Sequence, residues 1–337
     1  MPSTSPAQPA QTHSVTQNHA IAQALADAVT AAGYAPSIHN TQPWQWRLTG
    51  DHLDLYLEPG RLLEVTDPDT RFATVSCGAA LNHARVSLAA AGWRATVDRM
   101  PNAVAPEHLA RLSLTEHGPA DPQAVHRMQT IRLRYTDRRP VTGAPVGDDE
   151  LRAITMAVES EGTWLHILRP DQVLELAAAV DHARSAEAAQ PAWQAELASW
   201  TGCARPTGAG LPHAAITGPP QQTTMSGRDF GHHGDLPIDA EHDQTAVFAM
   251  LYGHGDQRLD WLHAGEGLSA AWLTATELGV TVLPLSAPIE VAGTRETLRR
   301  VIAYLGHPYL ILRLGTANPN DTQPPHTPRL PIDQTIQ

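Results

Sequence analysis

The residues best suited to chemistry are arginines gathered near the middle of the chain. Arg132, Arg134, Arg138 and Arg139 fall within eight positions, with the hydroxyl of Thr136 between them. A guanidinium presents forked donors that match the oxygens of a phosphate, so the segment predicts a phosphate-binding site. The segment also follows a predicted helix. Cations at a helix C-terminus can merely compensate the helix dipole, and that interpretation stays open.

A second candidate segment is the loop at 35–46, whose sequence is APSIHNTQPWQW. Pro36 and Pro43 stiffen it, because each proline fixes its own φ and biases the preceding residue toward extended backbone. Such a loop can present polar groups in a fixed direction, and the candidates are Ser37, Asn40 and Gln42. The alternative is that these side chains only satisfy nearby backbone groups.

Composition excludes several other classes of site. The 23 basic residues, all arginine, against 35 acidic ones give a net charge of −12, which repels nucleic acid. Without lysine the chain can form neither a Schiff base nor a Walker-type phosphate loop. The eighteen histidines show no ligand spacing, and Cys77 and Cys203 are too few for a zinc cluster or a disulfide scaffold. We therefore predict no metal site, and no catalytic side chain is visible.

The elements that must position these residues follow from hydrophobic spacing. Helices are predicted over 16–32, 72–91, 121–133, 148–161, 170–189, 257–278 and 294–303, and strands over 44–48, 53–57, 93–97, 109–116, 163–168, 246–251 and 309–314. The mixed order predicts an α+β fold and not a βαβ alternation. Residues 1–14 are interpreted as a disordered leader. No apolar run approaches the roughly 20 residues of a membrane span, so we expect a soluble protein. Only two cysteines occur, which fits a reducing, cytoplasmic location.

Two further features concern organisation. Residues 190–239 are rich in Gly, Pro, Thr and His after one short amphipathic piece, which is typical of a lid or of disorder. The segments 81–92 and 268–279 are both Ala-rich helices that begin with Leu and end in Gly, 187 positions apart. This echo indicates two related halves, although such helices are also common by chance.

The motifs then add a resemblance. The Pro-Ser-x-x-Asn-x-Gln-Pro-Trp string at 36–44 resembles the loop at the FMN site of nitroreductase-superfamily flavoproteins, and Arg-Tyr-Thr-Asp-Arg at 134–138 resembles their Arg-x-Ser-x-Arg/Lys motif. A helix at 268–278 that ends in Gly279, a loop at 283–286, a strand at 309–315 and the closing segment 329–331 are similar to their C-terminal elements, so the likeness covers most of 15–335. The loop precedes the arginine motif here, which reverses the usual order and resembles the Acg-like actinobacterial branch.

That branch implies a nitroreductase-like fold in which two half-domains of one chain imitate the usual homodimer. The halves would be 15–120 and 121–337, the second with an inserted lid at about 190–239. One composite cofactor site per chain would result, so a monomer is expected.

The resemblance also implies which residues would bind FMN. Arg134 and Thr136 would contact the phosphate or ribityl chain, and Arg329 would close the phosphate from the tail. Arg138 would face the pyrimidine edge, where a fixed cation favours negative charge on the reduced ring. Arg139 is not assigned, because the adjacent Asp137 can pair with it.

The ring would be held by the other half and by the backbone near N5. The implied ring contacts are Pro36, Ser37, Asn40 and the backbone at 283–286, which includes Leu283 and Ser286. The implied activity is hydride transfer from NAD(P)H through FMN to a nitroaromatic or quinone-like acceptor by a ping-pong mechanism. The alternative is an FMN storage or sequestration protein with a closed lid and little turnover.

Overall fold

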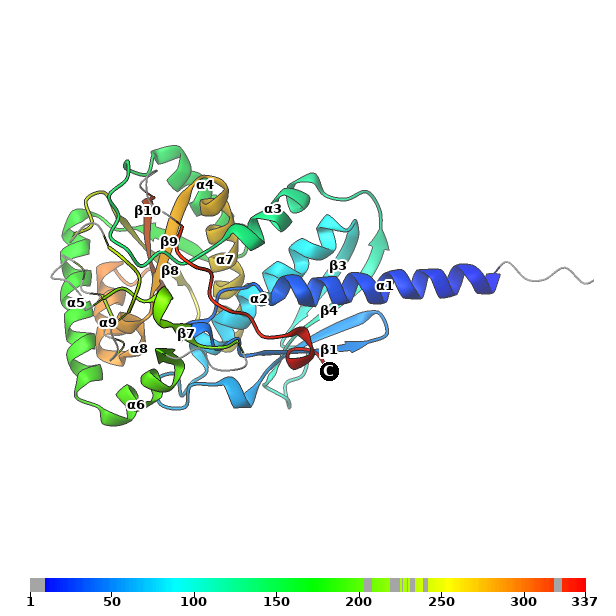
Figure 1. The fold of residues 1–337 in the computed structure, drawn as a ribbon, viewed down its shortest axis with the longest axis horizontal. Helices are drawn as coiled ribbons and strands as arrows, with labels where there is room; N and C mark the ends of the chain where they lie inside the picture. Colours follow the sequence, from blue (N-terminus) through cyan, green and yellow to red (C-terminus); the bar gives the residue numbers. More distant parts are fainter. Residues whose placement is uncertain are drawn as a thin grey trace, which may run out of the picture.

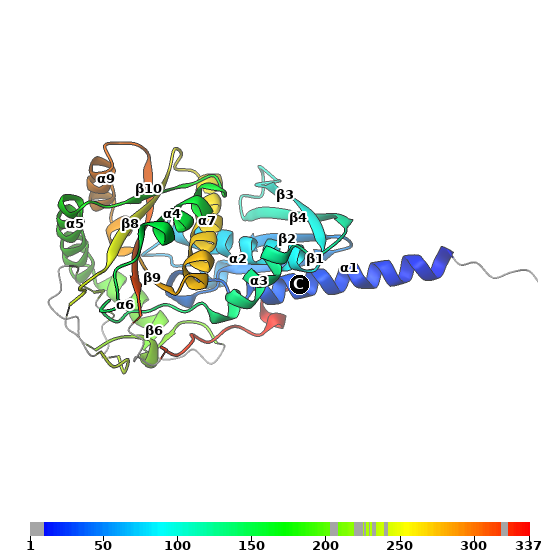
Figure 2. The same cartoon turned by 90° about the horizontal axis from the view of Figure 1, so that it is seen from above.

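Two four-stranded antiparallel sheets lie on opposite sides of two long central helices that pack against each other (Figures 1 and 2). The computed structural model describes residues 10–202, 208–218, 225, 227–228, 230, 234–238, 242–317 and 323–337, with the side chains of 10–18 left aside. The central helices are α2 (Arg71–Ala90) and α7 (Arg258–Glu277). Both are buried along most of their length, because each covers a sheet on one side and the other helix on the other side.

The first half contains one sheet with the strand order β1-β2-β4-β3. Alternating apolar residues in its strands face a core that includes Trp44, Trp46, Leu53 and Leu55, all fully buried. Its elements are α1 (Ala10–Ala32), β1 (Trp44–Thr49), β2 (His52–Leu57), α2, β3 (Trp93–Arg99) and β4 (His108–His117).

The second half repeats this topology, because its sheet has the order β5-β8-β10-β9. The matching strands are β1 with β5, β2 with β8, β4 with β10 and β3 with β9, and α4 and α7 take the places of α1 and α2. Its core includes Trp272, Tyr309 and Leu312. Its elements are α4 (Asp148–Glu159), β5 (Trp164–Ile167), β8 (Val247–Gly253), α7, β9 (Val280–Leu285) and β10 (His307–Thr316).

The two halves meet around an approximate two-fold axis between α2 and α7. A Cβ added at Gly78 would lie 2.9 Å from Cα of Gly265, and one added at Gly265 would lie 2.7 Å from Cα of Gly78. Asn82 and Ser269, which are 187 positions apart like the two glycines, are hydrogen-bonded to each other at 2.8 Å. Contacts between equivalent positions are what a two-fold interface produces. The predicted α+β fold with two related halves is confirmed.

The remaining elements link or decorate the halves. α3 (Pro122–Leu133) leads from the first half to the second, and the C-terminal tail returns, with the amide of Trp46 donating to the carbonyl of Thr335 at 2.8 Å (Figure 1). Two insertions enlarge the second half, at the turns that are short in the first. They contain α5 (Pro170–Ala188), α6 (Pro191–Trp200), β6 (Thr201–Gly202) and β7 (Leu211–Pro212) before β8, and α8 (Ala287–Glu290) and α9 (Ala292–Val301) before β10.

Two boundaries differ from the predictions. Helix α1 begins at Ala10, so residues 10–14 of the predicted leader are helical, because neither Pro nor Gly interrupts the sequence between Pro9 and Gly33. Residues 1–9 lie outside the described part. Residues 283–285, predicted as a loop, are the end of β9, and Pro284 is tolerated because β9 is the last strand in its sheet.

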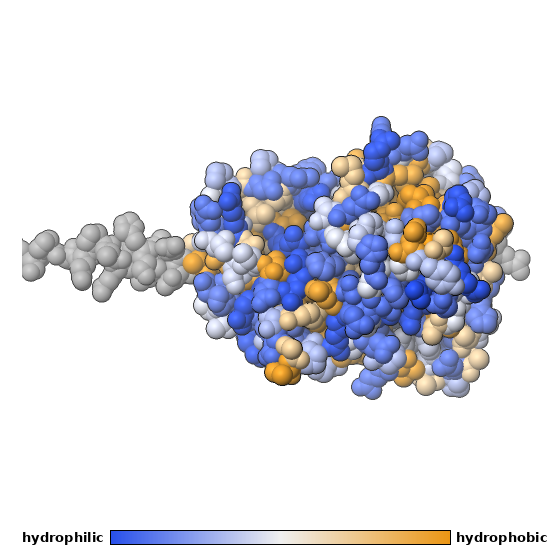
Figure 3. All heavy atoms as spheres, turned by 180° about the vertical axis from the view of Figure 1, so that it is seen from behind, coloured by the Kyte–Doolittle hydropathy of each residue, from blue (hydrophilic) through white to orange (hydrophobic). Residues whose placement is uncertain are grey.

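The surface agrees with the acidic, polar composition. The face in Figure 3 is mostly hydrophilic, with hydrophobic side chains in scattered groups. None of the helices in the described ranges is long and apolar enough to cross a membrane. Cys77 is buried in α2, as expected of a core residue, whereas Cys203 and much of the 190–239 insertion lie outside the described residues.

Candidate functional site

A deep pocket lies where the two halves, the insertion and the C-terminal tail meet. The space inside it is about 1390 Å³, a figure that includes its opening to solvent. All nine predicted site residues line it, and they come from four separate segments: Pro36, Ser37, Asn40, Arg134, Thr136, Arg138, Leu283, Ser286 and Arg329. The structure thus brings together the nine residues that the resemblance assigned to the cofactor site, whereas Gln42, Arg132 and Arg139 lie outside the pocket lining.

The loop that follows α1 has a strained backbone. His39, Asn40 and Gln42 have φ values of +44°, +56° and +51°, in the left-handed region that non-glycine residues rarely adopt. The amide of Gln42 donates to the Ser37 hydroxyl at 3.0 Å, which ties the loop across its base. Several kcal/mol of strain of this kind persist only where the surroundings fix the backbone, and such strain gathers at functional sites.

The side-chain amide of Asn40 is fully used by protein partners. It donates to the carbonyls of Gly210 and Pro328, both at 3.0 Å, and its oxygen accepts from Nη1 of Arg329 at 2.8 Å. Asn40 therefore holds the tail and the insertion together and orients Arg329. A contact between Asn40 and a flavin ring stays a prediction.

Gln42 has a similar role that the sequence interpretation left unassigned. Its Nε2 donates to the Gly208 carbonyl at 3.1 Å, and its Oε1 accepts from the amide of Leu330 at 3.0 Å. Gly208 has φ +84°, and a Cβ there would lie 2.9 Å from the carbonyl carbon of Arg329. The insertion and the tail are thus closely packed beside the loop, and a glycine is required at this contact.

Three arginines give the pocket an excess of positive charge. Arg134 is buried and lies over the Trp272 ring at 4.5 Å, and Arg134 and Arg329 each donate to the Tyr34 carbonyl at 3.2 Å. Arg138 donates to the Ala215 carbonyl at 2.9 Å. No carboxylate in the described part of the chain forms an ion pair with any of the three.

Desolvation makes these cations costly. It lowers the pKa of Arg134 to about 9, with a further contribution from nearby Arg329, and lowers the pKa of Arg329 and of Arg138 to about 10. The Nε atoms of Arg134 and Arg329 are buried without a hydrogen-bond partner among the described residues. Buried charges are normally paired, so this end of the pocket is suited to an anion with several acceptor oxygens.

The segment that carries Arg138 is held rigidly. Arg139 pairs with Asp137, with Nη2 to Oδ2 at 2.8 Å, which confirms the expected pairing. Arg313 of β10 donates to the carbonyls of Asp137 and Arg139 at 3.0 and 2.6 Å. Next to them, Thr136 forms an isolated parallel β-bridge with Val282 at the free edge of β9.

His39 is a pocket residue that the motif analysis did not single out, although it stands inside the motif. Burial lowers its pKa to about 3, so the imidazole is neutral. Its Nε2 has no hydrogen-bond partner among the described residues, and its ring meets the Phe230 ring edge-on at 6.3 Å. A neutral, unpaired imidazole can accept or donate one hydrogen bond to a ligand.

Arg228 and Phe230 of the insertion line the pocket, and Arg228 is held by two buried glutamates. Its guanidinium makes two hydrogen bonds of 2.7 Å to Glu290 and one of 3.2 Å to Glu187, whose side chains are 1% and 4% exposed. The Arg228 cation lowers the pKa of Glu290 against the opposing effect of burial, while burial raises that of Glu187 to about 7. Sequence could not reveal this cluster, because its members lie on separate segments.

The walls of the pocket are apolar, and the chemistry available from side chains is limited. The aliphatic and aromatic lining residues include Phe72, Val75, Leu268, Trp272, Leu283 and Leu310. Within the described residues, no group of three or more His, Cys, Asp or Glu side chains could hold a metal ion. The arrangement suits a flat apolar group with an anionic tail.

Several known proteins are similar to this chain, although no family model matches it. The protein described as "Putative NAD(P)H nitroreductase acg" from Mycobacterium tuberculosis is 34% identical, over 93% of this chain and 95% of its own length. A second M. tuberculosis protein described as a putative NAD(P)H nitroreductase is 35% identical, over 94% of this chain and 92% of its own length.

Solved structures with some likeness include the FMN-dependent nitroreductase NfnB of Mycobacterium smegmatis in complex with NADPH. It has 15% identity and a TM-score of 0.40, over 64% of this chain and 98% of that one. A Bacteroides fragilis nitroreductase with bound FMN has 13% identity and a TM-score of 0.37, over 60% and 93%. These likenesses are too low to carry an argument, whereas the identity to the M. tuberculosis proteins extends over nearly the whole chain. The chain therefore belongs to the Acg-type NAD(P)H nitroreductase family that these relatives represent.

Proposed function

We propose that the pocket binds FMN and that the protein is an NAD(P)H-dependent oxidoreductase of the nitroreductase type. The observation that carries the proposal is the set of desolvated arginines, Arg134, Arg138 and Arg329, which have no ion-paired carboxylate in the described structure and open onto an apolar pocket. The names of the relatives support the same activity. Bound FMN would supply hydride chemistry, for which the chain needs no acid–base pair of its own.

The phosphate of FMN would lie at the polar end of the pocket. Arg134, Arg329 and Thr136 line this end of the pocket and supply guanidinium and hydroxyl donors. The Trp272 ring supports the Arg134 guanidinium at 4.5 Å, and the Asn40 side chain fixes Arg329. These contacts are made before any ligand arrives, so little side-chain entropy is lost on binding.

The ring would lie between the strained loop and the end of β9. Pro36 and Ser37 would contact one side, and the backbone from Leu283 to Ser286 would approach the ring near N5. Arg138 would lie near the pyrimidine edge and favour negative charge there. The acceptor would be a nitroaromatic or quinone-like compound, bound in the same place after the nicotinamide leaves.

A second candidate function is FMN storage or sequestration, and the ion pair between Arg228 and Glu290 favours it. If the insertion stays over the pocket through the Arg228–Glu290 pair, it would restrict the access of bulky substrates. We propose a monomer in either case, because both halves of the pocket come from one chain. The free thiol of Cys77 fits a reducing, cytoplasmic location.

Anaerobic mixing separates the two functions. The purified protein, loaded with FMN, is mixed in turn with NADPH, NADH and dithionite while the visible flavin absorbance is recorded. Rapid bleaching by a nicotinamide, followed by reoxidation with a quinone, supports the oxidoreductase. Bleaching by dithionite alone supports storage. Protein that gains no FMN on reconstitution contradicts both.

A further inference from the structure

Part of the pocket lining is not used by the proposed contacts to FMN. Besides those contacts, the pocket is lined by Val180 and Arg184 of α5, by His39 of the strained loop and by Phe230 of the insertion. Val180 and Arg184 are four positions apart, so they lie on the same face of the helix. These residues are available to recognise a second ligand.

One ion-pair cluster borders both polar members of this group. The charges of Arg228 and Glu290 act on the His39 ring. Arg228 also donates to Glu187 at 3.2 Å, and Glu187 follows Arg184 by three positions on α5, close enough for the charge of Arg184 to act on it. His39 and Arg184 therefore lie on the same side of the pocket.

Arg184 has no carboxylate partner in the described part of the chain. The residue is half-buried, and its side chain makes no hydrogen bond or ion pair with a described residue. Glu187, the acidic residue one turn further along α5, is already paired with Arg228. The donors of the Arg184 guanidinium are thus free for a ligand, and a carboxylate matches them with two parallel hydrogen bonds.

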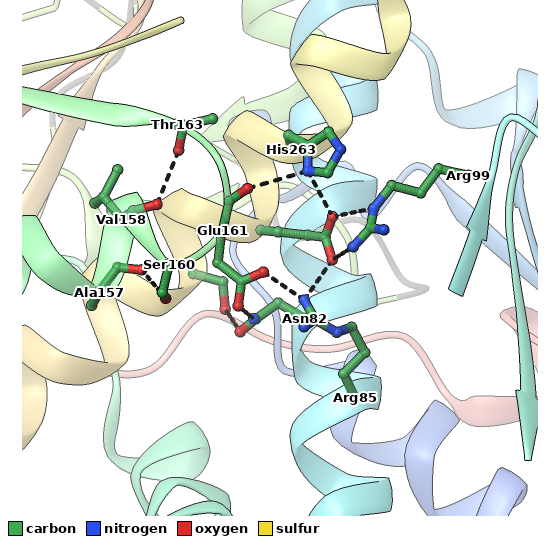
Figure 4. A network of polar contacts seen from close by, with 11 residues as sticks. Asn82, Arg85, Arg99, Ala157, Val158, Ser160, Glu161, Thr163 and His263 are labelled. Atoms are coloured by element: carbon green, nitrogen blue, oxygen red, sulfur yellow. Dashed lines mark hydrogen bonds and ion pairs between the residues drawn. The ribbon is translucent and has the colours of Figure 1, made fainter. Parts of the chain in front are cut away.

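Arginines in other parts of the described structure show a different arrangement. Arg85 and Arg99 both pair with the fully buried Glu266 (Figure 4). Arg71, which is also buried, pairs with Asp256. In both places the counter-ion belongs to the protein, so an anionic ligand would gain little. An arginine that lines a pocket without such a partner is instead suited to an anion from outside.

The charge balance of the pocket indicates a second anion. Four lining arginines have no ion-paired carboxylate among the described residues: Arg134, Arg138, Arg184 and Arg329. A phosphate monoester carries about −1.5 to −2 charges at neutral pH, so the phosphate of FMN would balance about two of these cations. A reduced ring beside Arg138 would balance a third. Arg184 remains, and a ligand with one negative charge would complete the balance.

His39 offers a different kind of contact on the same side. It is 8% exposed, and its Nε2 has no hydrogen-bond partner among the described residues. The ring meets the Phe230 ring edge-on at 6.3 Å. A neutral imidazole can form one hydrogen bond with an uncharged polar group, and the two rings give an aromatic ligand apolar surface to pack on.

We propose that Arg184, His39 and Phe230 form an acceptor subsite that selects an aromatic compound carrying a carboxylate, with Arg184 as the specificity-determining residue. The inference rests on the proposed binding of FMN, because the subsite is a part of the pocket that the FMN contacts leave unused. The carboxylate of the ligand would pair with Arg184. Its reducible nitro or quinone oxygens would lie nearer to His39.

The test compares two probes that differ in charge and hardly in shape, 4-nitrobenzoate and 4-nitrobenzamide. Each is titrated against the oxidised, FMN-loaded full chain, and binding is followed by the change in the visible flavin spectrum, so no turnover is needed. We expect 4-nitrobenzoate to bind about tenfold more tightly, because a charge-assisted hydrogen bond is stronger than a neutral one.

Two variants and a control assign this preference to residues. Arg184→Gln, checked to hold FMN by its absorbance, should reduce the ratio of the two affinities to about one. Arg152→Gln removes the same charge from an exposed position on α4 and should keep the parental ratio. His39→Phe should weaken the binding of both probes by a similar factor, because it removes a hydrogen bond that both would make.

Equal affinities of the parent for the two probes, or a parental ratio in Arg184→Gln, would overturn the proposal. NADP⁺ is titrated in parallel, because its phosphates are another source of negative charge for Arg184. If Arg184→Gln loses affinity for NADP⁺ and keeps its preference for 4-nitrobenzoate, Arg184 belongs to the dinucleotide and the proposal is overturned. Protein that takes up no FMN contradicts the proposed function and this inference with it, whereas FMN binding without a charge preference contradicts this inference alone.

Discussion

Replacing Arg134 with methionine should stabilise the protein without FMN and weaken its binding of FMN. The guanidinium of Arg134 is buried, contacts Trp272 and makes one hydrogen bond, to the Tyr34 carbonyl. Methionine keeps most of the apolar stem and removes the charge. Arg134→Met therefore separates the cost of a desolvated cation from the gain that the cation brings once an anion is bound.

The expected magnitudes follow from the pKa. Burial lowers the pKa of Arg134 from its ordinary value to about 9, and at about 1.4 kcal/mol per unit this gives a desolvation cost of roughly 5 kcal/mol as an upper bound. Loss of the hydrogen bond and of the cation–π contact with Trp272 offsets about 3 to 4 kcal/mol. The net gain of about 1 kcal/mol should raise the midpoint of the flavin-free protein by about 2 °C. Loss of a charge-assisted contact should weaken FMN binding by about 10- to 100-fold.

The assay is thermal unfolding with and without saturating FMN, together with an FMN titration. Arg134→Met should unfold above the parent without FMN and below it with FMN, because ligand stabilisation scales with affinity. Arg152→Met, at a side chain that is 66% exposed, is the control, and its unfolding midpoints with and without FMN should equal those of the parent. If Arg134→Met lowers the flavin-free midpoint, or leaves the FMN-induced shift unchanged, the desolvated-cation argument is refuted.

The same geometry leads to three other expectations. Asn40→Ala should release Arg329 and weaken FMN binding by about 1 to 2 kcal/mol, measured by flavin fluorescence. The urea midpoint should also fall, because two carbonyls lose their hydrogen-bond donor. An unchanged affinity for FMN would exclude the positioning role of Asn40. Gly208→Ala should displace the backbone of Arg329 and impair FMN binding. Gly218→Ala is the control and should leave FMN binding unchanged, because no atom lies within 4 Å of an added Cβ. Equal FMN affinities of the two variants would contradict the close packing at Gly208. Burial raises the pKa of Glu187 from 4.5 to about 7, so the folded state holds the proton more tightly and stability should fall as pH rises from 4.5 to 7. Glu187→Gln should flatten that part of the urea-midpoint profile, and a parental slope would contradict the assignment.

The sequence was most informative where function depends on short contiguous segments. The proline-framed loop and the arginine segment each carry their candidate residues within ten positions, so residue type and spacing made Asn40 and Arg134 candidates, and both line the pocket. Adjacency also predicted the Arg139–Asp137 pair. Each of these expectations rests on local geometry, which the sequence specifies directly.

The sequence was least informative where partners come from distant segments. Gln42 joins Gly208 and Leu330, which are 166 and 288 positions away, and no local pattern relates them. Arg228 and Glu290 are similarly remote from each other and looked like ordinary charged residues. The resemblance implied a loop at 283–286, but Pro284 stands in β9, because an edge strand can lack the donor that proline removes. In each case tertiary packing, and not local preference, decides the outcome.

The charged residues on the two sides of the α2–α7 interface are paired in different ways, although the two halves share one topology. On one side, Arg134 and Arg329 have no ion-paired carboxylate among the described residues, and their burial costs stability. On the other side, Glu266 pairs with Arg85 and Arg99, so ion pairs join the two halves directly. A homodimer must repeat every side chain at both of its equivalent positions. A chain with both halves in one sequence can change the two positions independently.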